Sequence, residues 1–115
     1  GKCPSGFIVI CQDTRISENL TAYLRDVGIT AQTMLLAAVE KGLGGCMIGS
    51  FQKEELKTAL EIPEYLVPML VLAIGAPDEE IVLEDACGTI TYYRDEKGVH
   101  HVPKRTMEEL VISRK

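Results

Sequence analysis

The stretch of residues 26–51, DVGITAQTMLLAAVEKGLGGCMIGSF, constrains the fold of this chain more than any other part of the sequence. It predicts a helix with few polar members that runs to Lys41, with Asp26 as its N-cap. A helix with so little polar surface is buried on most sides, in a core or at an interface. Gly42 is expected to end it as the C′ residue, with a glycine-rich turn beyond. The loop after this helix is therefore the first place to look for a ligand.

Short apolar runs bounded by turn residues predict the strands. They occur at residues 7–11, 46–48 and 67–75. Pro68 indicates that the third of these is an edge strand, or that Pro68 lies where the strand starts. Two further runs, at residues 89–93 and 99–102, are expected to pair as a hairpin around the turn between them.

Three further segments have helical patterns. Residues 17–24 predict a short helical turn with Ser17 as N-cap, and residues 52–60 predict an exposed amphipathic helix. A third helix is expected to start at Thr106, with Glu109 in the capping-box position. Strands and helices mixed in this way indicate an α+β or α/β fold in three layers.

Size and charge limit the classes of function. A length of 115 residues suits one small domain or a fragment of a larger one. The formal net charge of −5 argues against general nucleic-acid binding, because a surface that neutralises phosphates is basic. No apolar run approaches the roughly 20 residues of a membrane span.

The four cysteines do not form a recognisable motif. None of them belongs to a C-x-x-C pair, which argues against a zinc site and against a thioredoxin-like site. Cys11 and Cys46 lie in apolar runs and are expected to be small buried hydrophobic residues. A reduced, cytoplasmic protein is the simplest interpretation.

Two interpretations remain open for the glycine-rich turn at residues 42–45. It is not a Walker A loop, because no Lys-Ser/Thr follows, and not a dinucleotide fingerprint, because its glycines end a helix. The simpler interpretation is a helix cap and a tight turn. In the other, backbone groups from Met47 to Ser50 face a planar ligand, with Gly49 admitting the ring and Ser50 adding a hydroxyl.

A basic pair near the C-terminus also allows two interpretations. Lys104 and Arg105 lie between the hairpin and a helix start, where a phosphate would meet two cations and free backbone N–H groups. The alternative is a solvated pair with no specific role.

The remaining polar residues indicate no catalytic or metal site. His100 and His101 are adjacent on a predicted strand, so their side chains point to opposite faces and cannot easily share a metal. A structural or solvent role is expected for both. The acidic residues at 78–80 and 84–85 are expected to form a solvated loop. No Ser-His-Asp or Cys-His spacing stands out.

The chain resembles the C-terminal part of the nitroreductase family in four consecutive segments: AQTMLLAAVEKGLGGCMIGSF, EELKTALEIPE, VPMLVLAIGAP and KRTMEELV. In that family a long core helix leads into a GLG-x-C-x-I-G-x-F segment. A short helix ending in an Ile-Pro-Glu pattern, a strand closing in Gly-x-Pro and a basic pair before a final short helix follow. The resemblance covers nearly the whole chain in the family's order.

The resemblance implies flavin mononucleotide (FMN) bound at the interface of an intertwined homodimer. NAD(P)H would reduce the flavin, which would pass electrons to nitroaromatics, quinones or a related acceptor. The residues that match the segment beside the flavin ring, where a backbone N–H addresses flavin N5, are Met47, Ile48, Gly49 and Ser50. Lys104 and Arg105 match the basic residues that reach the flavin phosphate. No side chain is assigned as a catalytic proton donor.

The resemblance predicts an α+β, three-layer nitroreductase-like sandwich, with a mixed, mainly antiparallel sheet around a long buried helix. Residues 1–115 would form a single domain without the family's N-terminal segment. Family members carry an Arg-Arg-Ser-x-Arg-like motif and an Asn-x-Gln-Pro-Trp-like segment that contact the flavin, and neither motif is present here. The hairpin of residues 89–102 is an addition relative to the shortest members. The alternative function is therefore a catalytically silent flavin- or nucleotide-binding or interaction domain.

Overall fold

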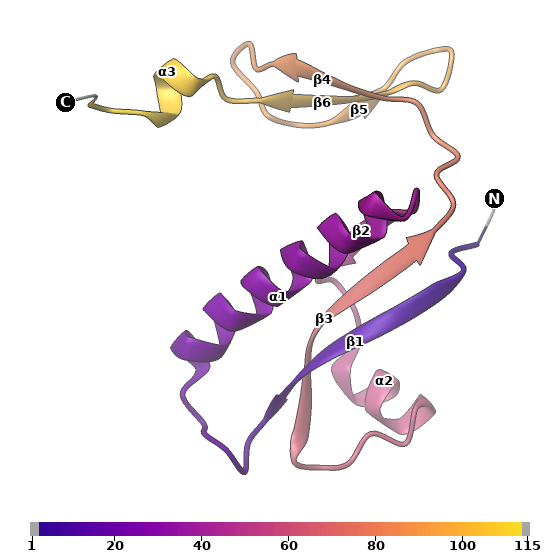
Figure 1. Cartoon of the computed structure of the whole chain (residues 1–115), viewed down its shortest axis with the longest axis vertical. Coiled ribbons are helices and arrows are strands. Elements are labelled where there is room, and N and C mark those ends of the chain that lie inside the picture. Colours follow the sequence, from indigo (N-terminus) through magenta and orange to yellow (C-terminus); the bar gives the residue numbers. More distant parts are fainter. Residues whose placement is uncertain (1–2, 114–115) are drawn as a thin grey trace. The chain divides into compact units, whose positions relative to one another are not determined.

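The computed structural model describes residues 3–113 of the chain. The chain folds as two compact units, Gly1–Pro77 and Asp78–Lys115, called unit 1 and unit 2. Each unit has a three-stranded sheet of its own (Figure 1). The combination of sheets and helices confirms the expected α+β class.

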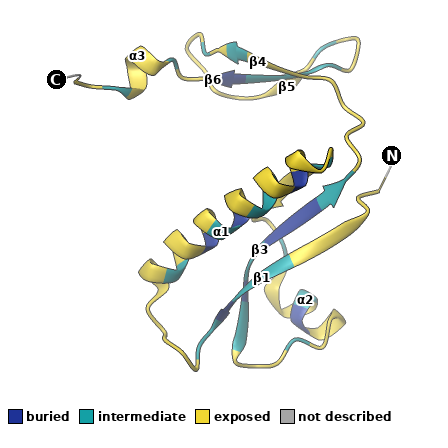
Figure 2. Cartoon of the chain, viewed as in Figure 1, coloured by how far each residue is buried: buried dark blue, intermediate teal, exposed yellow. Residues whose placement is uncertain are grey.

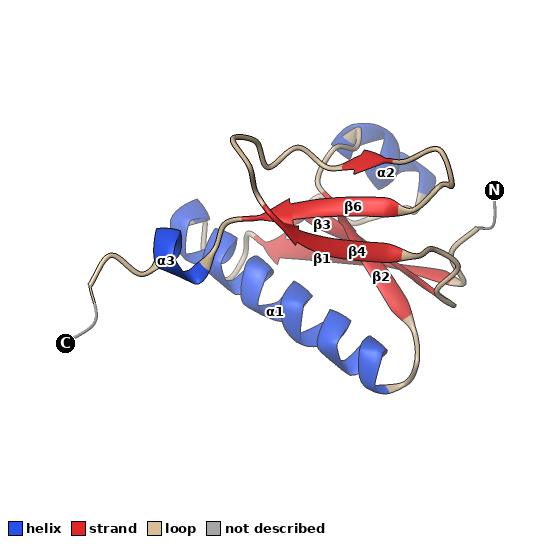
Figure 3. Cartoon of the chain, turned by 90° about the horizontal axis from the view of Figure 1, so that it is seen from above, coloured by secondary structure: helices blue, strands red, loops and turns tan. Residues whose placement is uncertain are grey.

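The sheet of unit 1 is antiparallel and has the strand order β1-β3-β2 (Figure 3). Its strands are β1 (Gly6–Asp13), β2 (Gly44–Ile48) and β3 (Leu66–Gly75), which confirms and extends the three predicted strands. β3 is central, so of the two alternatives for Pro68 the edge strand is wrong and the position near the strand start is confirmed. Pro68 lies near the start of β3, beyond the residues that pair with β2 and beside an irregularity in β1 after Ile10. There its missing N–H removes little from the ladder.

The long helix α1 (Leu20–Glu40) is continuous over 21 residues. Its N-cap is Asn19, whose side-chain oxygen accepts a hydrogen bond from the Ala22 amide at 3.3 Å. Asp26 lies inside the helix, so the predicted start at Asp26 and the separate turn capped by Ser17 are wrong. No proline or glycine lies between Asn19 and Asp26, so nothing in the sequence interrupts the helix there.

The C-terminus of α1 confirms the predicted glycine stop. Gly42 has φ +74°, a left-handed conformation in which glycine carries no steric cost. The Leu43 amide donates to the Ala38 carbonyl and the Gly42 amide donates to the Val39 carbonyl, both at 2.9 Å. These two bonds form a Schellman motif, which satisfies carbonyls left free by the helix end and turns the chain into β2.

Only one side of α1 is covered. It packs against the sheet through its buried residues Val27, Ala31 and Ala38, while Leu72 of β3 is fully buried. Large apolar side chains on the rest of the helix are 53–67% exposed: Leu20, Leu24, Ile29, Leu36 and Val39 (Figure 2). The expected burial on most sides is therefore not met by the described residues, because a three-stranded sheet covers one face of a helix.

The short helix α2 (Lys53–Ala59) follows β2 and packs against β3. It confirms the helix predicted at residues 52–60. Lys57 is buried on it, and its ammonium group lies 3.2 Å from the Glu64 carboxylate and 3.4 Å from the Glu64 carbonyl oxygen. These contacts join the helix to the loop that leads into β3, since a buried ammonium needs hydrogen-bond acceptors.

Unit 2 contains a small mixed sheet with the order β4-β6-β5. Its elements are β4 (Ile81–Asp85), β5 (Tyr93–Arg94), β6 (His100–Lys104) and the helix α3 (Met107–Leu110). β5 and β6 pair antiparallel and confirm a hairpin, but the predicted bounds of its first strand are wrong: residues 89–92 are not in a strand, and Arg94, predicted in the turn, belongs to β5. β4 runs parallel to β6, so the prediction of a solvated loop is wrong for Glu84 and Asp85. The run Ile81-Val82-Leu83 supplies the β-propensity that favours a strand there.

The start of α3 confirms the predicted capping box. The Thr106 hydroxyl accepts from the Glu109 amide at 3.4 Å, and the Glu109 carboxylate accepts from the Thr106 amide at 3.2 Å. This box fixes the direction in which the chain leaves Lys104 and Arg105.

The two cysteines in strands differ in burial. Cys11 is half-buried, and desolvation raises the pKa of its thiol. Cys46 is exposed, which corrects the prediction of a buried residue. It lies on the outer strand β2, whose neighbouring residue Gly45 faces α1, so Cys46 points to the opposite face of the sheet.

Across the described part of the chain, no helix has both the length and the apolar character needed to cross a membrane.

Candidate functional site

The first part of the candidate site is the β2 strand and the loop that follows it. Gly45 faces α1 so closely that an added Cβ would overlap the side chain of Leu35 and lie 3.1 Å from the Ala73 carbonyl oxygen. β2 can therefore approach the helix only because residue 45 has no side chain. Met47, two residues on, lies on the same face of the strand and is 40% exposed. The close packing at Gly45 thus fixes the backbone that leads to Met47 and Ile48.

The loop beyond β2 is open where β2 itself is crowded. Gly49 and Ser50 are exposed, and a Cβ added at Gly49 would meet no atom within 4 Å. Within the described chain, the amides of Gly49 and Ser50 donate no hydrogen bond to another residue. A flat polar ligand would find backbone donors here and no side chain in its way, which fits the expectation for these two residues.

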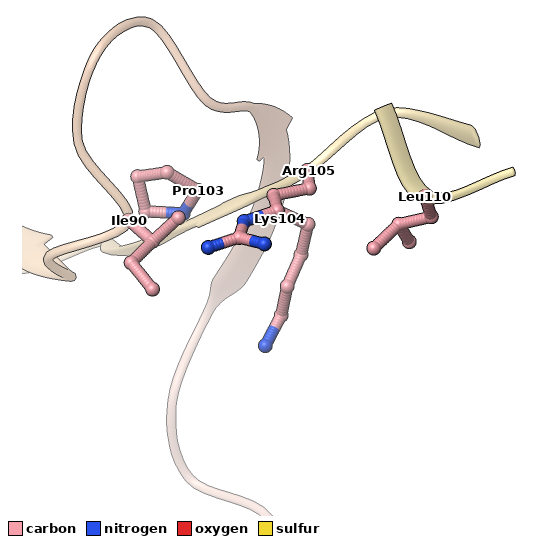
Figure 4. Close-up of a pocket in the computed structure, with 5 residues that line it drawn as sticks. All are labelled: Ile90, Pro103, Lys104, Arg105 and Leu110. Atoms are coloured by element: carbon pink, nitrogen blue, oxygen red, sulfur yellow. The ribbon is translucent and has the colours of Figure 1, made fainter. Parts of the chain in front are cut away.

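The second part of the candidate site is the basic pair at the end of β6. Lys104 and Arg105 line an open cavity of about 390 Å³ together with Ile90, Pro103 and Leu110 (Figure 4). Arg105 also lines a neighbouring cavity with Thr89 and Glu109. Both cationic side chains are exposed. Cationic and apolar groups together suit a phosphate attached to an organic body.

The structure supports the assigned role of the two histidines and identifies their partners. His100 Nδ1 lies 3.5 Å from the Glu79 carboxylate, which also binds Arg94 at 2.8 Å. The Arg94 guanidinium, with a smaller contribution from His100, holds the pKa of Glu79 below its usual value. Glu79 therefore belongs to a cluster of ion pairs, where the sequence predicted only solvation.

His101 lies in a separate polar cluster with partners of its own. Its ring contacts Glu84 and Asp95 and stacks on Tyr93, with ring centroids 4.7 Å apart. The predicted hairpin, with its turn at residues 94–98, would have placed Tyr93 opposite residue 99, whereas the structure shifts the turn and pairs Tyr93 with His101. The sequence contained no signal for Glu84, since the parallel strand β4 was not predicted.

The predicted site residues divide between the two units. Met47, Ile48, Gly49 and Ser50 form one contiguous segment of unit 1. Lys104 and Arg105 form the end of the β6 strand and the loop before α3 in unit 2.

Comparisons with known proteins agree with the resemblance. The model of the nitroreductase family matches residues 8–76, which include β1, α1, β2, α2 and β3. A protein of Pseudomonas sp. strain G-1 named Cr(VI) reductase is 36% identical over 63 residues, covering 53% of this chain and 26% of the relative. FMN reductase (NADPH) of Bacillus subtilis is 35% identical over 63 residues, covering 53% of this chain and 25% of the relative.

A solved structure extends the likeness to nearly the whole chain. NfrA1 of B. megaterium superposes with a TM-score of 0.54 at 24% sequence identity and covers 93% of this chain, so it supports the fold. The chain spans less than half of the length of these relatives, and 49% of the NfrA1 chain. Because the family model covers more than half of its residues, the chain belongs to the nitroreductase family.

Proposed function

We propose that this chain supports FMN-dependent oxidoreduction, in which NAD(P)H donates electrons that pass to a nitroaromatic, a quinone or a similar acceptor. The observation that carries the proposal is the family match over residues 8–76, which includes the open segment after β2. Relatives named FMN reductase (NADPH) and NADPH-dependent oxidoreductase are consistent with it. When bound, the flavin would supply the capacity to accept a hydride and release electrons.

The residues of unit 1 would orient the flavin ring. Met47 and Ile48 would border the ring, and the amides of Gly49 and Ser50 would donate hydrogen bonds to its polar edge. The absence of any atom near a Cβ at Gly49 supports this assignment, because the ring needs unobstructed backbone there. Donors that are already in place before binding lower the entropy cost of holding the ligand.

The residues of unit 2 would hold the phosphate. Lys104 and Arg105 offer an ammonium and a guanidinium beside an apolar wall of Ile90, Pro103 and Leu110. Arginine binds phosphate oxygens in a bidentate manner, and lysine adds a point charge. We include both units in one nitroreductase-like domain of residues 1–115, since NfrA1 superposes over 93% of the chain.

The same proposal includes a homodimer that uses NAD(P)H and a small aromatic acceptor. Of the exposed apolar residues of α1, Ile29, Leu36 and Val39 lie together on the side away from the buried residues, and they support a second copy as the occupant of that helix face, since a monomer rarely exposes several large apolar side chains together. We also keep the cytoplasm as the proposed location.

A comparison of two flavins tests the phosphate assignment. FMN and riboflavin differ only by the phosphate, so the full chain is expected to bind FMN more tightly, measured by quenching of flavin fluorescence. The Lys104→Gln and Arg105→Gln substitutions should each weaken FMN about tenfold and leave riboflavin unchanged, given that a charged hydrogen bond contributes about 1.5 kcal/mol. Lys97→Gln is the matched control, because Lys97 is exposed in the β5–β6 turn.

The outcomes separate the hypotheses. Equal binding of FMN and riboflavin would remove Lys104 and Arg105 from the site. No binding of either flavin would contradict the flavin proposal. Tight FMN binding without NAD(P)H oxidation would identify the alternative, a catalytically silent flavin-binding domain.

A further inference from the structure

His101 lies between two carboxylates that belong to different segments of unit 2. Its Nδ1 is 3.2 Å from Glu84 Oε2 on β4, and its Nε2 is 3.5 Å from Asp95 Oδ2 in the turn between β5 and β6. The ring stacks on Tyr93 of β5 with an angle of 2° between the ring planes. Tyr93 in turn donates its hydroxyl to Glu84 Oε1 at 3.1 Å. The histidine side chain is 19% exposed, so these partners replace most of its contact with water.

This arrangement has a direct chemical consequence. A neutral imidazole carries one N–H, and its other nitrogen is an acceptor. Here both ring nitrogens face oxygens of carboxylates, which are acceptors when ionised. Only the doubly protonated imidazolium can donate to both carboxylates at once. Both hydrogen bonds can therefore form when His101 is protonated, and only one of them can form when it is neutral.

We propose that His101 is a pH-dependent latch, which when protonated fastens β4 and the β5–β6 turn to β6 and which releases one of them when it loses its proton. The latch is distinct from flavin binding, and it acts within unit 2 alone. It uses one side chain on the central strand of the small sheet to hold two segments that are far apart in the sequence, at Glu84 and Asp95.

The contact to Asp95 is the one expected to open. It is the longer of the two, and Asp95 has other partners, because its Oδ1 accepts from the amides of Lys97 and Val99 at 2.9 Å each. After deprotonation the remaining N–H would stay with Glu84, and Asp95 Oδ2 would face a lone pair. Asp95 and Glu84 would then repel each other without a cation between them.

The charged groups of β5 and of the β5–β6 turn do not supply a substitute cation. Arg94 is committed to Glu79, in the cluster with His100 on the other face of the sheet. Lys97 and Glu96 are exposed in the turn, and in the described chain neither forms an ion pair with His101, Glu84 or Asp95. The charge on His101 is thus the one that holds the cluster together.

The sign of the pH dependence follows from the direction of the shift. The hydrogen bond to Glu84, supported by Asp95, raises the pKa of His101 above its usual 6.5, against some desolvation. A histidine whose pKa is higher in the folded state stabilises that state fully below the unfolded pKa, and loses this contribution as the pH rises through the folded pKa. The latch is therefore closed below the pKa that His101 has in the folded chain and opens as the pH rises through it.

The latch also bears on the strand that carries Lys104. The released turn leads directly into β6, which ends at Lys104, so loosening of the turn acts on the strand whose Lys104 carbonyl accepts from the Ala86 amide at 2.8 Å. An effect on phosphate binding would rest on the proposed function. The titration of His101 and the protection of the β5–β6 turn do not depend on it.

Proton NMR of the full chain tests the latch, because the sequence contains only two histidines and therefore two imidazole Cε1–H signals. A His101→Gln variant assigns them. We expect His101 to titrate above pH 6.5, and its midpoint to fall by about one pH unit in Glu84→Gln and by less in Asp95→Asn. Both substitutions keep the size of the side chain, and Glu96→Gln in the same turn is the control that should leave the midpoint unchanged.

Amide hydrogen exchange supplies the second readout. After correction for the intrinsic effect of pH, protection of the turn amides of Lys97, Gly98 and Val99, which donate to Asp95, should fall several-fold as the pH passes the His101 midpoint. The β4 amides should stay protected, because Glu84 keeps its hydrogen bond, and Glu84→Gln should move the step to lower pH. A His101 midpoint that neither variant moves would overturn the proposal. So would a shifted midpoint with protection that does not change across it. Flavin binding enters neither measurement, so failure of the latch and failure of the proposed function are distinguishable.

Discussion

Two glycines at the candidate site, Gly45 and Gly49, differ in the space around them. At Gly45 a Cβ would overlap the Leu35 side chain and approach the Ala73 carbonyl, whereas at Gly49 it would meet nothing within 4 Å. The first glycine is needed for packing between β2 and α1. The second has no packing reason to lack a side chain, which leaves the approach of a ligand as the role that would use it.

The Gly45→Ala substitution should destabilise unit 1. Its methyl group would push Leu35 and the β3 backbone apart, and overpacking of this kind costs about 1–3 kcal/mol. Urea denaturation followed by circular dichroism measures the loss in the free energy of unfolding. An unchanged midpoint would show that β2 does not approach α1 as described.

The Gly49→Ala substitution should leave stability nearly unchanged and weaken FMN binding. Stability is expected to stay within about 0.5 kcal/mol of the original chain, because the added methyl group enters open space. Affinity for FMN should fall if the ring lies against this backbone, as fluorescence quenching would show. Unchanged FMN affinity in this variant would place the ring elsewhere.

At the scale of elements, α1 starts at a different residue from the one that the local sequence pattern predicts. Asn19 caps the helix, whereas Asp26 lies within it and is exposed. Asn19→Ala should therefore cost about 1 kcal/mol of stability. Asp26→Ala should change stability by about 0.5 kcal/mol or less, as is usual for an exposed helix position. A larger loss of stability in Asp26→Ala than in Asn19→Ala would mean that the helix starts at Asp26.

Local signals predicted most elements of this chain but not how they pair. The glycine stop at Gly42, the capping box at Thr106 and the apolar strands depend on neighbours in the sequence, and all are confirmed. β4 was missed because its partner β6 lies some 20 residues further on and its last residues are acidic. The exposure of Cys46 depends on which face of β2 the helix covers, and this too is set by tertiary packing.

In the candidate site, too, local features could be predicted from the sequence and long-range contacts could not. The structure shows an open backbone at Gly49 and exposed cations at Lys104 and Arg105, while the roles of these residues come from the family resemblance and stay predictions. The partners of His101 could not be predicted from the sequence, since Glu84 and Asp95 contact His101 only because β4, β5 and β6 pair. Side chains brought together by long-range pairing have no local pattern that reveals them.

At the scale of the whole molecule, the uncovered face of α1 is the main feature to explain. Sedimentation velocity should show a species of twice the 12.6 kDa chain mass. Leu36→Lys should shift it toward monomer, because a charge would be buried at the interface. Ile112→Lys is the control, since Ile112 is 98% exposed and lies outside α1. A stable monomer that remains well folded at high concentration would contradict the dimer.

Anaerobic reduction of bound flavin by NAD(P)H tests the central claim most directly. The chain is first loaded with FMN, freed of unbound flavin and mixed with NADH or NADPH under exclusion of oxygen. The account predicts that the visible absorbance of the flavin bleaches on mixing and returns when a quinone or a nitroaromatic is added. Bound flavin that stays oxidised in the presence of both nucleotides would contradict it.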